Sequence, residues 1–219
     1  MYNNKKFLAI IPARGGSTRL PKKNLKMLLG KPLVKWTIDD AKKSKILDRI
    51  ILSTDDSKIK EIGEKSKIEI HHRSPELSSE TSLIIDTLYD VSKNNAGFDI
   101  LYLNPTSPIR QKGLIDTCIK KFVDKKFDAV ASGIIAKYVK WPTNMKRTQD
   151  LEGYFIDNGA VYVYNESLIR RKTLLSKKFG TVLVDKSEYV DIDDEFDFKM
   201  AEVIMKYKIE KETQEESKI

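Results

Sequence analysis

The chain has 219 residues, of which 40% are hydrophobic, and its 40 Lys and Arg against 32 Asp and Glu give a net charge of +8. This composition excludes a wholly disordered chain, and a single cysteine excludes a disulfide framework or a multi-thiolate zinc site within the chain. No apolar run approaches the ~18–20 residues of a membrane span. The stretch from Met1 to Lys6 is too short and polar for a signal peptide, so we expect a soluble, cytoplasmic protein with one domain over residues 1–219.

Strands and helices are expected to alternate through the first two thirds of the chain. Short apolar runs bounded by turn residues predict strands, and apolar residues at i, i+4 and i+7 predict helices. The expected elements are, in chain order, strand 7–12, a helix from Pro32, strand 48–55, helix 57–66, strand 68–73, helix 79–93, strand 98–105, helix 113–125, strands 127–135 and 154–164, helix 166–172, strand 181–184, a last helix from Asp194, and a frayed tail 210–219. The last helix has an apolar stripe at Phe196, Met200, Val203 and Tyr207.

This order of elements predicts the fold class. Parallel strands need crossovers about as long as these helices, so we expect an α/β fold with a mostly parallel sheet flanked by helices on both faces. Ligands of such sheets bind at the carboxyl ends of the strands. The loops after Pro12, Asp55, Arg73 and Pro105 should therefore line one edge of the sheet.

Most of the positive charge lies near the loop that follows the first strand. Residues 1–35 hold nine Lys and Arg and no Asp or Glu, which leaves the rest of the chain close to neutral. Within the loop 13–24, Gly15 and Gly16 allow a tight turn and close approach of backbone N–H groups to a ligand, and the loop cations suit a polyphosphate. These cations are Arg14, Arg19, Lys22 and Lys23. The loop matches neither a dinucleotide fingerprint nor a P-loop, and on its own it is also compatible with a basic surface loop.

Seven segments, taken together, resemble the CMP-sialic acid synthetase (acylneuraminate cytidylyltransferase) family. They are IIPARGGSTRLPKKNLKMLLGKPLVKWTI, DRIILSTDD, RSPELSSETS, LNPTSPIR, RTQDL, NGAVYVY and VDIDDEFDFKMAE, and they occur in the family's order. The resemblance implies a Rossmann-like fold of the nucleotide-diphospho-sugar transferase type. It also implies transfer of CMP from CTP to the anomeric hydroxyl of a nonulosonic acid, a nine-carbon 2-keto sugar acid of the sialic type. Pyrophosphate is released, and the product serves surface glycan synthesis.

The resemblance also implies which residues bind the nucleotide. They are Ala13, Arg14, Gly15, Ser17, Lys22, Asn24, Arg73 and Ser82. Ala13 and Gly15 would act through backbone groups, and Arg73 would donate to the cytosine carbonyl. Without the resemblance, the simpler interpretation of Arg73 is a solvated charge at a strand end. Lys22, Arg14 and Asp193 are the expected catalytic residues. Two departures from the family pattern are Thr18 in place of Lys and Glu80 in place of Asp.

Two aspartates near the last helix form the predicted metal site. In an extended VDID segment, the side chains of Asp191 and Asp193 share one face. Mg²⁺ typically takes one or two carboxylates together with substrate phosphates. Helix capping is the alternative for Asp193 and explains Asp194 well, but Asp191 lies too early for it. By resemblance, both Asp191 and Asp193 bind Mg²⁺ or Mn²⁺.

The sugar acid is expected to contact four residues by resemblance, namely Asn104, Arg147, Gln149 and Asn158. The family has Gln where this chain has Asn104, one methylene shorter. In the family, the region 136–160 forms an arm that swaps across a homodimer. This chain has only 136–146 before RTQDL, so a homodimer formed through a shortened arm is left open by the sequence.

Other residues and functions are less favoured. His71 and His72 are adjacent on a strand and point to opposite faces, and Cys118 is expected in the core. The alternatives for function are a cytidylyltransferase for the eight-carbon sugar acid KDO, a sugar-transferring enzyme that uses the DID segment as a D-x-D metal motif, and a basic nucleic-acid-binding module. The sequence has no recognition-helix or aromatic RNA-binding motif, so we expect no nucleic-acid partner.

Overall fold

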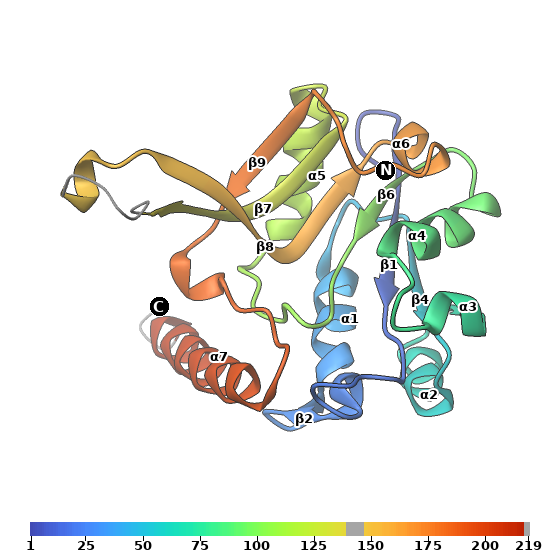
Figure 1. The fold of residues 1–219 in the computed structure, drawn as a ribbon, viewed down its shortest axis with the longest axis horizontal. Helices are drawn as coiled ribbons and strands as arrows, with labels where there is room; N and C mark the ends of the chain where they lie inside the picture. The colour runs from blue at the N-terminus through green and yellow to red at the C-terminus, as the bar shows by residue number, and fades with distance from the viewer. Residues whose placement is uncertain (139–146, 217–219) are drawn as a thin grey trace.

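The computed structural model describes residues 1–138 and 147–216, and within them seven strands form one sheet in the order β5-β4-β1-β6-β8-β7-β9 (Figure 1). Among the described strands of this sheet, β8 alone runs antiparallel to its neighbours, β6 and β7. The strands are β1 Lys6–Pro12, β4 Arg49–Thr54, β5 Glu69–His72, β6 Phe98–Tyr102, β7 Ala129–Lys137, β8 Gly153–Tyr164 and β9 Phe179–Leu183. The predicted α/β fold with a mostly parallel sheet is confirmed.

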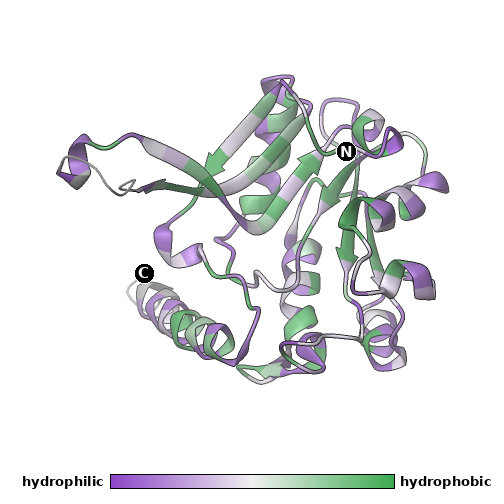
Figure 2. Ribbon diagram, viewed as in Figure 1, coloured by the Kyte–Doolittle hydropathy of each residue, from purple (hydrophilic) through white to green (hydrophobic). Residues whose placement is uncertain are grey.

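Helices cover both faces of the sheet because the central strands are apolar on both sides, as the green of these strands in Figure 2 shows. Alternate residues of β1 enter different cores. Phe7, Ala9 and Ile11 pack with α1, α2 and α5, whereas Leu8 and Ile10 pack with α4 and α6. These helices are α1 Leu33–Lys43, α2 Ser57–Lys65, α4 Ile84–Lys93, α5 Leu114–Asp124 and α6 Glu166–Arg170. Cys118 is fully buried in the first of these cores, as predicted, and burial raises its pKa to about 12.

Short elements fill the loops at the carboxyl edge. They are η1 Lys23–Leu25, β2 Met27–Leu28, β3 Lys31–Pro32, α3 Pro75–Ser78, η2 Thr148–Asp150 and η3 Lys186–Glu188. The prediction of one helix over 79–93 is wrong at its start. Ser74 caps α3, the backbone turns extended at Ser79, and α4 begins only at Ile84. This places Glu80 and Ser82 in a loop.

The last helix, α7 Glu195–Glu216, departs from the sequence prediction in two ways. It continues well past residue 210, where fraying was expected. Its inward face is also not the predicted stripe, because the buried positions are Phe198, Ala201 and Met205, which pack with the β2–β3 region. The predicted stripe points outward, with exposed fractions of 72% at Phe196 and 66% at Tyr207. Apolar residues occur on both sides of this helix, so periodicity alone could not choose the buried side.

The strands β7 and β8 extend beyond the rest of the sheet as a protruding hairpin, which we call the arm (Figure 1). Pairing continues from Gly133↔Asp157 out to Lys137↔Gly153, after a register shift next to Gly133. A short arm is therefore present, although residues 139–146 lie outside the described part of the chain. Within that part, no helix combines the length and the apolar character that a membrane crossing requires.

Candidate active site

The loops after β1, β5 and β6 meet at the carboxyl edge of the sheet, as predicted, and form a pocket of about 290 Å³ that we call the cationic pocket. The loop after β4 reaches the same edge, where Asp55 accepts from the Gly15 N–H, but it does not line the pocket. Its lining includes seven of the predicted site residues: Arg14, Ser17, Asn24, Arg73, Ser82, Asn104 and Asp193. Thr106 and Glu80 also line this pocket, and neither was among the predicted site residues. Both lie in segments that carry the family resemblance, where Glu80 was noted only as a departure from the family pattern.

The glycines of the first loop serve different purposes. A Cβ on Gly15 would lie 2.8 Å from Cβ of Asp56, so this position needs glycine for close backbone approach, whereas the space above Gly16 is open. The backbone N–H groups of Ala13 and Gly15 already donate to the Ser53 carbonyl and to Asp55, both at 2.8 Å. In this structure these two N–H groups therefore shape the loop and are not free to bind phosphate, and the open space at Gly16 is the place for a ligand.

The cations of the loop are held in position by other segments. Arg14 donates from Nη1 to the Ser79 carbonyl at 2.9 Å, and Arg19 pairs with Asp193 at 2.9 Å. Lys23 lies in the cationic pocket with its side chain only 12% exposed and donates from Nζ to the Ile192 carbonyl at 2.6 Å. Lys22 is exposed, lies outside the pocket lining and has a left-handed backbone, with φ of 54°. Adjacent lysines cannot be told apart by sequence, so only the structure shows that Lys23 points inward.

Arg73 is buried, at 6% exposed, and is not the solvated strand-end charge that the residue alone suggested. Its Nε donates to the Leu77 carbonyl at 2.9 Å. Burial lowers its pKa, with Asp55 opposing and Arg14 adding to this shift. Its terminal amino groups donate to no described residue and are available to a ligand in the cationic pocket, where Ser82 lies beside them in the lining.

Asn24 contributes a buried acceptor to the same pocket. Its Nδ2 donates to the Arg14 carbonyl at 3.0 Å, while Oδ1 is buried and has no partner among the described residues. A buried acceptor without a donor is costly, so a ligand N–H or O–H is the expected partner. A nucleoside base or ribose offers both kinds of donor.

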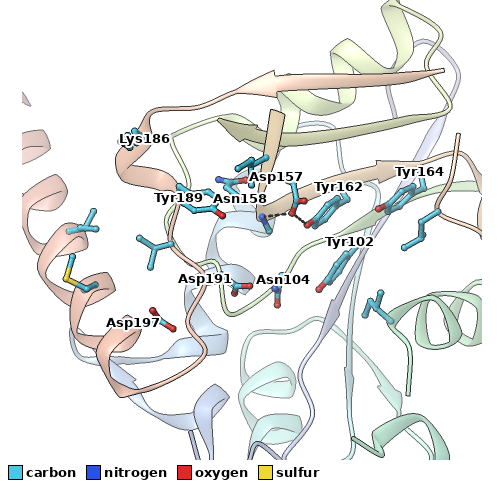
Figure 3. Close-up of a pocket in the computed structure, with 17 residues that line it drawn as sticks. Tyr102, Asn104, Asp157, Asn158, Tyr162, Tyr164, Lys186, Tyr189, Asp191 and Asp197 are labelled. Atoms are coloured by element: carbon cyan, nitrogen blue, oxygen red, sulfur yellow. Dashed lines mark hydrogen bonds between the residues drawn. The ribbon is translucent and has the colours of Figure 1, made fainter. Parts of the chain in front are cut away.

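A second and larger pocket of about 840 Å³ adjoins the first, and we call it the tyrosine pocket (Figure 3). It shares Ile84, Tyr102 and Asn104 with the cationic pocket. Tyr102 and Tyr162 stack with ring centroids 5.1 Å apart, and the Tyr162 hydroxyl donates to Asp157. Burial, the largest cause, raises the pKa of both phenols, so both stay neutral at ordinary pH.

The two predicted sugar-contacting asparagines have different surroundings in the tyrosine pocket. Asn158 is buried, donates to the Glu188 carbonyl at 3.1 Å and accepts from the Ser132 hydroxyl at 2.7 Å. It therefore fixes a wall of the pocket. Asn104 accepts from the Thr106 N–H at 3.3 Å, and its Nδ2 has no partner among the described residues, so it can donate to a ligand.

The two predicted metal ligands line different pockets. Asp191 lines the tyrosine pocket and accepts from the hydroxyls of Thr106 and Ser107 through Oδ1, whereas Asp193 lines the cationic pocket and pairs through Oδ1 with Arg19 and Lys23. The Oδ2 atom of each accepts from no described residue. Asp194 caps α7 by accepting from the N–H of Asp197, so capping explains Asp194 and not Asp191.

The described residues contain no group of three or more His, Cys, Asp or Glu that could hold a metal ion by itself. Two carboxylates with free oxygens beside a cationic pocket fit the other mode, in which Mg²⁺ completes its coordination with substrate phosphates and waters.

Two predicted sugar contacts are not brought to the site within one chain. Arg147 and Gln149 lie on the arm, and neither lines either pocket. The Arg147 side chain is 76% exposed and pairs with Asp150 at 3.0 Å. That they complete the sugar side of the site stays a prediction: within one chain the β7–β8 hairpin carries them outward, away from both linings.

The sequence model of the family described as "Cytidylyltransferase" matches residues 8–217. The chain belongs to the cytidylyltransferase family. The chain is 30% identical to N-acylneuraminate cytidylyltransferase of Oncorhynchus mykiss, over 89% of this chain and 49% of that one. It is also 30% identical to CMP-N,N'-diacetyllegionaminic acid synthase of Legionella pneumophila, over 91% and 96%, and to pseudaminic acid cytidylyltransferase of Campylobacter jejuni, over 92% and 97%.

This cytidylyltransferase thus spans about half the length of some relatives and nearly all of others. Its fold is similar to that of CMP:2-keto-3-deoxy-manno-octonic acid synthetase, a structure complexed with CTP, with a TM-score of 0.74 at 16% identity over 93% of this chain and 100% of that one. At this identity the likeness shows the shared fold alone.

Proposed function

We propose that this cytidylyltransferase transfers CMP from CTP to the anomeric hydroxyl of a nonulosonic acid and releases pyrophosphate. The observation that supports the proposal most directly is that two pockets of different character share Ile84, Tyr102 and Asn104, with Asp191 in the lining of one and Asp193 in the lining of the other. The cationic pocket suits a nucleoside triphosphate, and the tyrosine pocket is large enough for a sugar acid. A reaction between two substrates requires this adjacency, since holding them side by side removes much of the entropic barrier.

The chain's own residues would act mainly by binding and orienting. Arg14, Arg19, Lys22 and Lys23 would hold the triphosphate and stabilise the charge that develops on pyrophosphate. Arg73 would donate to the cytosine carbonyl, and backbone groups near Ser82 would pair with the exocyclic amine.

Asp191 and Asp193 would hold Mg²⁺ or Mn²⁺ through their free Oδ2 atoms. The ion, when bound, supplies charge neutralisation at the phosphates. In this arrangement Arg19 and Lys23 would leave the Asp193 carboxylate and pair with phosphate oxygens when CTP binds. One carboxylate cannot pair with two cations and also bind a divalent ion.

The direct test is pyrophosphate release from CTP and Mg²⁺ with sialic, legionaminic and pseudaminic acids as separate acceptors. Release with at least one of them, together with a CMP-sugar of the matching mass, is the expected result. Release with the eight-carbon KDO alone would instead identify the runner-up function. A preference for a finished nucleotide sugar, with no pyrophosphate, would identify a sugar transferase and refute the proposal.

We further propose a cytoplasmic homodimer in which the arm of one copy completes the tyrosine pocket of the other. The support is the charge of this pocket, whose described lining contains Asp157, Asp191 and Asp197 but a single cation, Lys186. A sugar carboxylate needs more positive charge than this, and Arg147 on the exposed arm could supply it.

Mixed dimers test the exchange. Asp191→Asn has a defective pocket and an intact arm, and Arg147→Ala has the reverse. Each variant alone should be inactive, and mixing them through co-expression should restore turnover at one pocket per dimer. No restoration, or a monomer by sedimentation at enzyme concentrations used in the assay, would contradict the arm exchange.

A further inference from the structure

Arg110 lies in the loop between β6 and α5, behind the tyrosine pocket, with its side chain only 1% exposed. Its guanidinium donates to three separate segments. Nη2 donates to the Asn104 carbonyl at 2.7 Å, Nε to the Ala160 carbonyl at 3.1 Å, and Nη1 to the Thr37 hydroxyl at 2.9 Å. One planar group thus ties the loop after β6 and strand β8 to helix α1.

Two of these three partners belong to walls of the pockets. Asn104 lines both pockets, and Ala160 follows Asn158 and Gly159 of the tyrosine pocket in β8. The two segments pass close to each other, since a Cβ on Gly159 would lie 3.7 Å from Nδ2 of Asn104. The spacing of the two walls therefore depends on the group that bonds to both backbones.

The charge of Arg110 is buried at a cost. Burial lowers its pKa to about 10, opposed by the carboxylate of Asp40 at 3.9 Å, so it stays protonated at neutral pH. Buried ion pairs are weak evidence for stability, because well-packed apolar residues often do as well. What an apolar side chain cannot do is hold two carbonyl groups at fixed positions in one plane. Lysine cannot do it either, because its ammonium is a point charge without the planar fork.

We propose that Arg110 is a positioning residue for the sugar acid: it sets the position of Asn104 against β8 and so the fit of the tyrosine pocket. The inference rests on the proposed function, since it concerns the second substrate. The residues that hold the phosphates come from the β1 loop, which Arg110 does not contact through any hydrogen bond described above. Asn104 also borders the cationic pocket, but no loop cation bonds to Arg110, so CTP binding should depend on Arg110 much less than binding of the sugar acid does.

The test compares Arg110→Lys with a control of reduced stability, Phe122→Leu. Phe122 is buried in α5 and packs edge-on against Phe7 at the start of β1, at the opposite end of the strand from the pockets.

For each protein we would measure the melting temperature, the Kd for CTP by calorimetry, and kcat and KM for the sugar acid. We expect Arg110→Lys to raise the sugar KM about tenfold or more while the CTP Kd stays within about twofold, as for loss of a charge-assisted hydrogen bond on one substrate only. Phe122→Leu should lower the melting temperature without changing the sugar KM.

A second variant keeps the proposal testable if Arg110→Lys folds poorly. Thr37→Val removes only the hydrogen bond to α1, leaves both pocket contacts and the Asp40 carboxylate, and should keep a wild-type sugar KM. Equal changes in CTP Kd and sugar KM, or a sugar KM for Arg110→Lys that matches Phe122→Leu, would assign Arg110 a structural role only and overturn the proposal. If the wild-type chain turns over no sugar acid while binding CTP normally, the proposed function fails and this inference fails with it; a working wild type with an unaffected Arg110→Lys defeats the positioning role alone.

Discussion

Replacing Asp193 with Asn separates the proposed metal role from the structural one, because the substitution keeps the shape and removes the charge. In the structure, Oδ1 of Asp193 pairs with Arg19 at 2.9 Å and with Lys23 at 3.4 Å. The side chains of Asp193 and Arg19 are 40% and 68% exposed, so solvent screens their attraction. An exposed pair such as Arg19–Asp193 is worth about 0–1 kcal/mol. The Lys23 side chain is only 12% exposed, but its contact is long at 3.4 Å and Lys23 keeps its bond to the Ile192 carbonyl. The free energy of unfolding should therefore fall by about 1 kcal/mol, which lowers the melting temperature of a domain of this size by only ~2–4 °C.

The substitution should change turnover far more than it changes stability. Its effect on metal-free CTP binding should not follow its effect on turnover. Without metal, Asp193 competes with the triphosphate for Arg19 and Lys23, and one unit charge at ~4 Å in a water-like medium is worth about 1 kcal/mol. Metal-free CTP binding should thus be unchanged or up to ~5-fold tighter. Turnover should fall at least ~100-fold, since the variant loses one of two protein carboxylates beside the phosphates.

Three measurements check this reasoning: thermal unfolding, CTP calorimetry in the presence of a chelator, and pyrophosphate release with Mg²⁺. Asp194→Asn is the matched control, because Asp194 caps α7 and lines neither pocket. Near-wild-type turnover by Asp193→Asn would refute the ligand role. Loss of metal-free CTP binding in this variant would refute the view that the carboxylate competes with phosphate.

Three further substitutions test other features. Lys22→Gly should leave the free energy of unfolding unchanged or raise it by up to ~1 kcal/mol, because glycine relieves a left-handed backbone at φ of 54°. If this cation holds phosphate, the same substitution should slow pyrophosphate release. Equal rates for variant and wild type would place the lysine outside the site. Gly133→Ala should destabilise by about 1–3 kcal/mol in thermal unfolding, since the new Cβ would overlap the backbone carbonyl of Ile156, and a neutral result would mean that the bulge relaxes. Glu69→Gln should cost about 1 kcal/mol or less in urea unfolding near pH 7. The hydrogen bond from Arg49 lowers the Glu69 pKa below 4.5, so the stabilisation is full above that pH and is lost as the pH falls through the folded-state pKa. A wild-type advantage that persists at about pH 2 would contradict this assignment.

The sequence predicted the succession of strands along the chain well, because buried parallel strands are short apolar runs that are easy to recognise. It also placed four loops at one edge: three of them line the cationic pocket, and the loop after β4 bonds to the first of these through Asp55. The outward face of α7 was not predictable. Phe196 and Phe198 are two residues apart and thus lie on different sides of the helix, and only the position of the β2–β3 region decides that Phe198 is covered.

In the site, too, the identity of several residues was predicted from the sequence, but their burial and position were not. The family resemblance implied roles for Arg14, Asn24 and the two aspartates, but not the burial of Arg73, which depends on α3 folding back beside it. Nor could the sequence show that Arg147 lies outside the pocket, because that depends on how far β7 and β8 stay paired. Each of these outcomes is set by long-range packing.

The sheet divides the two pockets between two parts of the chain. The loops after β1, β5 and β6, within residues 12–106, carry most of the cationic pocket, whereas β8, η3 and α7 supply most of the tyrosine pocket. Ile84, Tyr102 and Asn104 are the shared described residues of the two linings. Such modular construction allows the acceptor to diverge while the nucleotide donor is retained, as the differently named sugars of relatives at the same 30% identity illustrate. Engineering a new acceptor preference should therefore begin in β8 and α7 and leave the first hundred residues untouched.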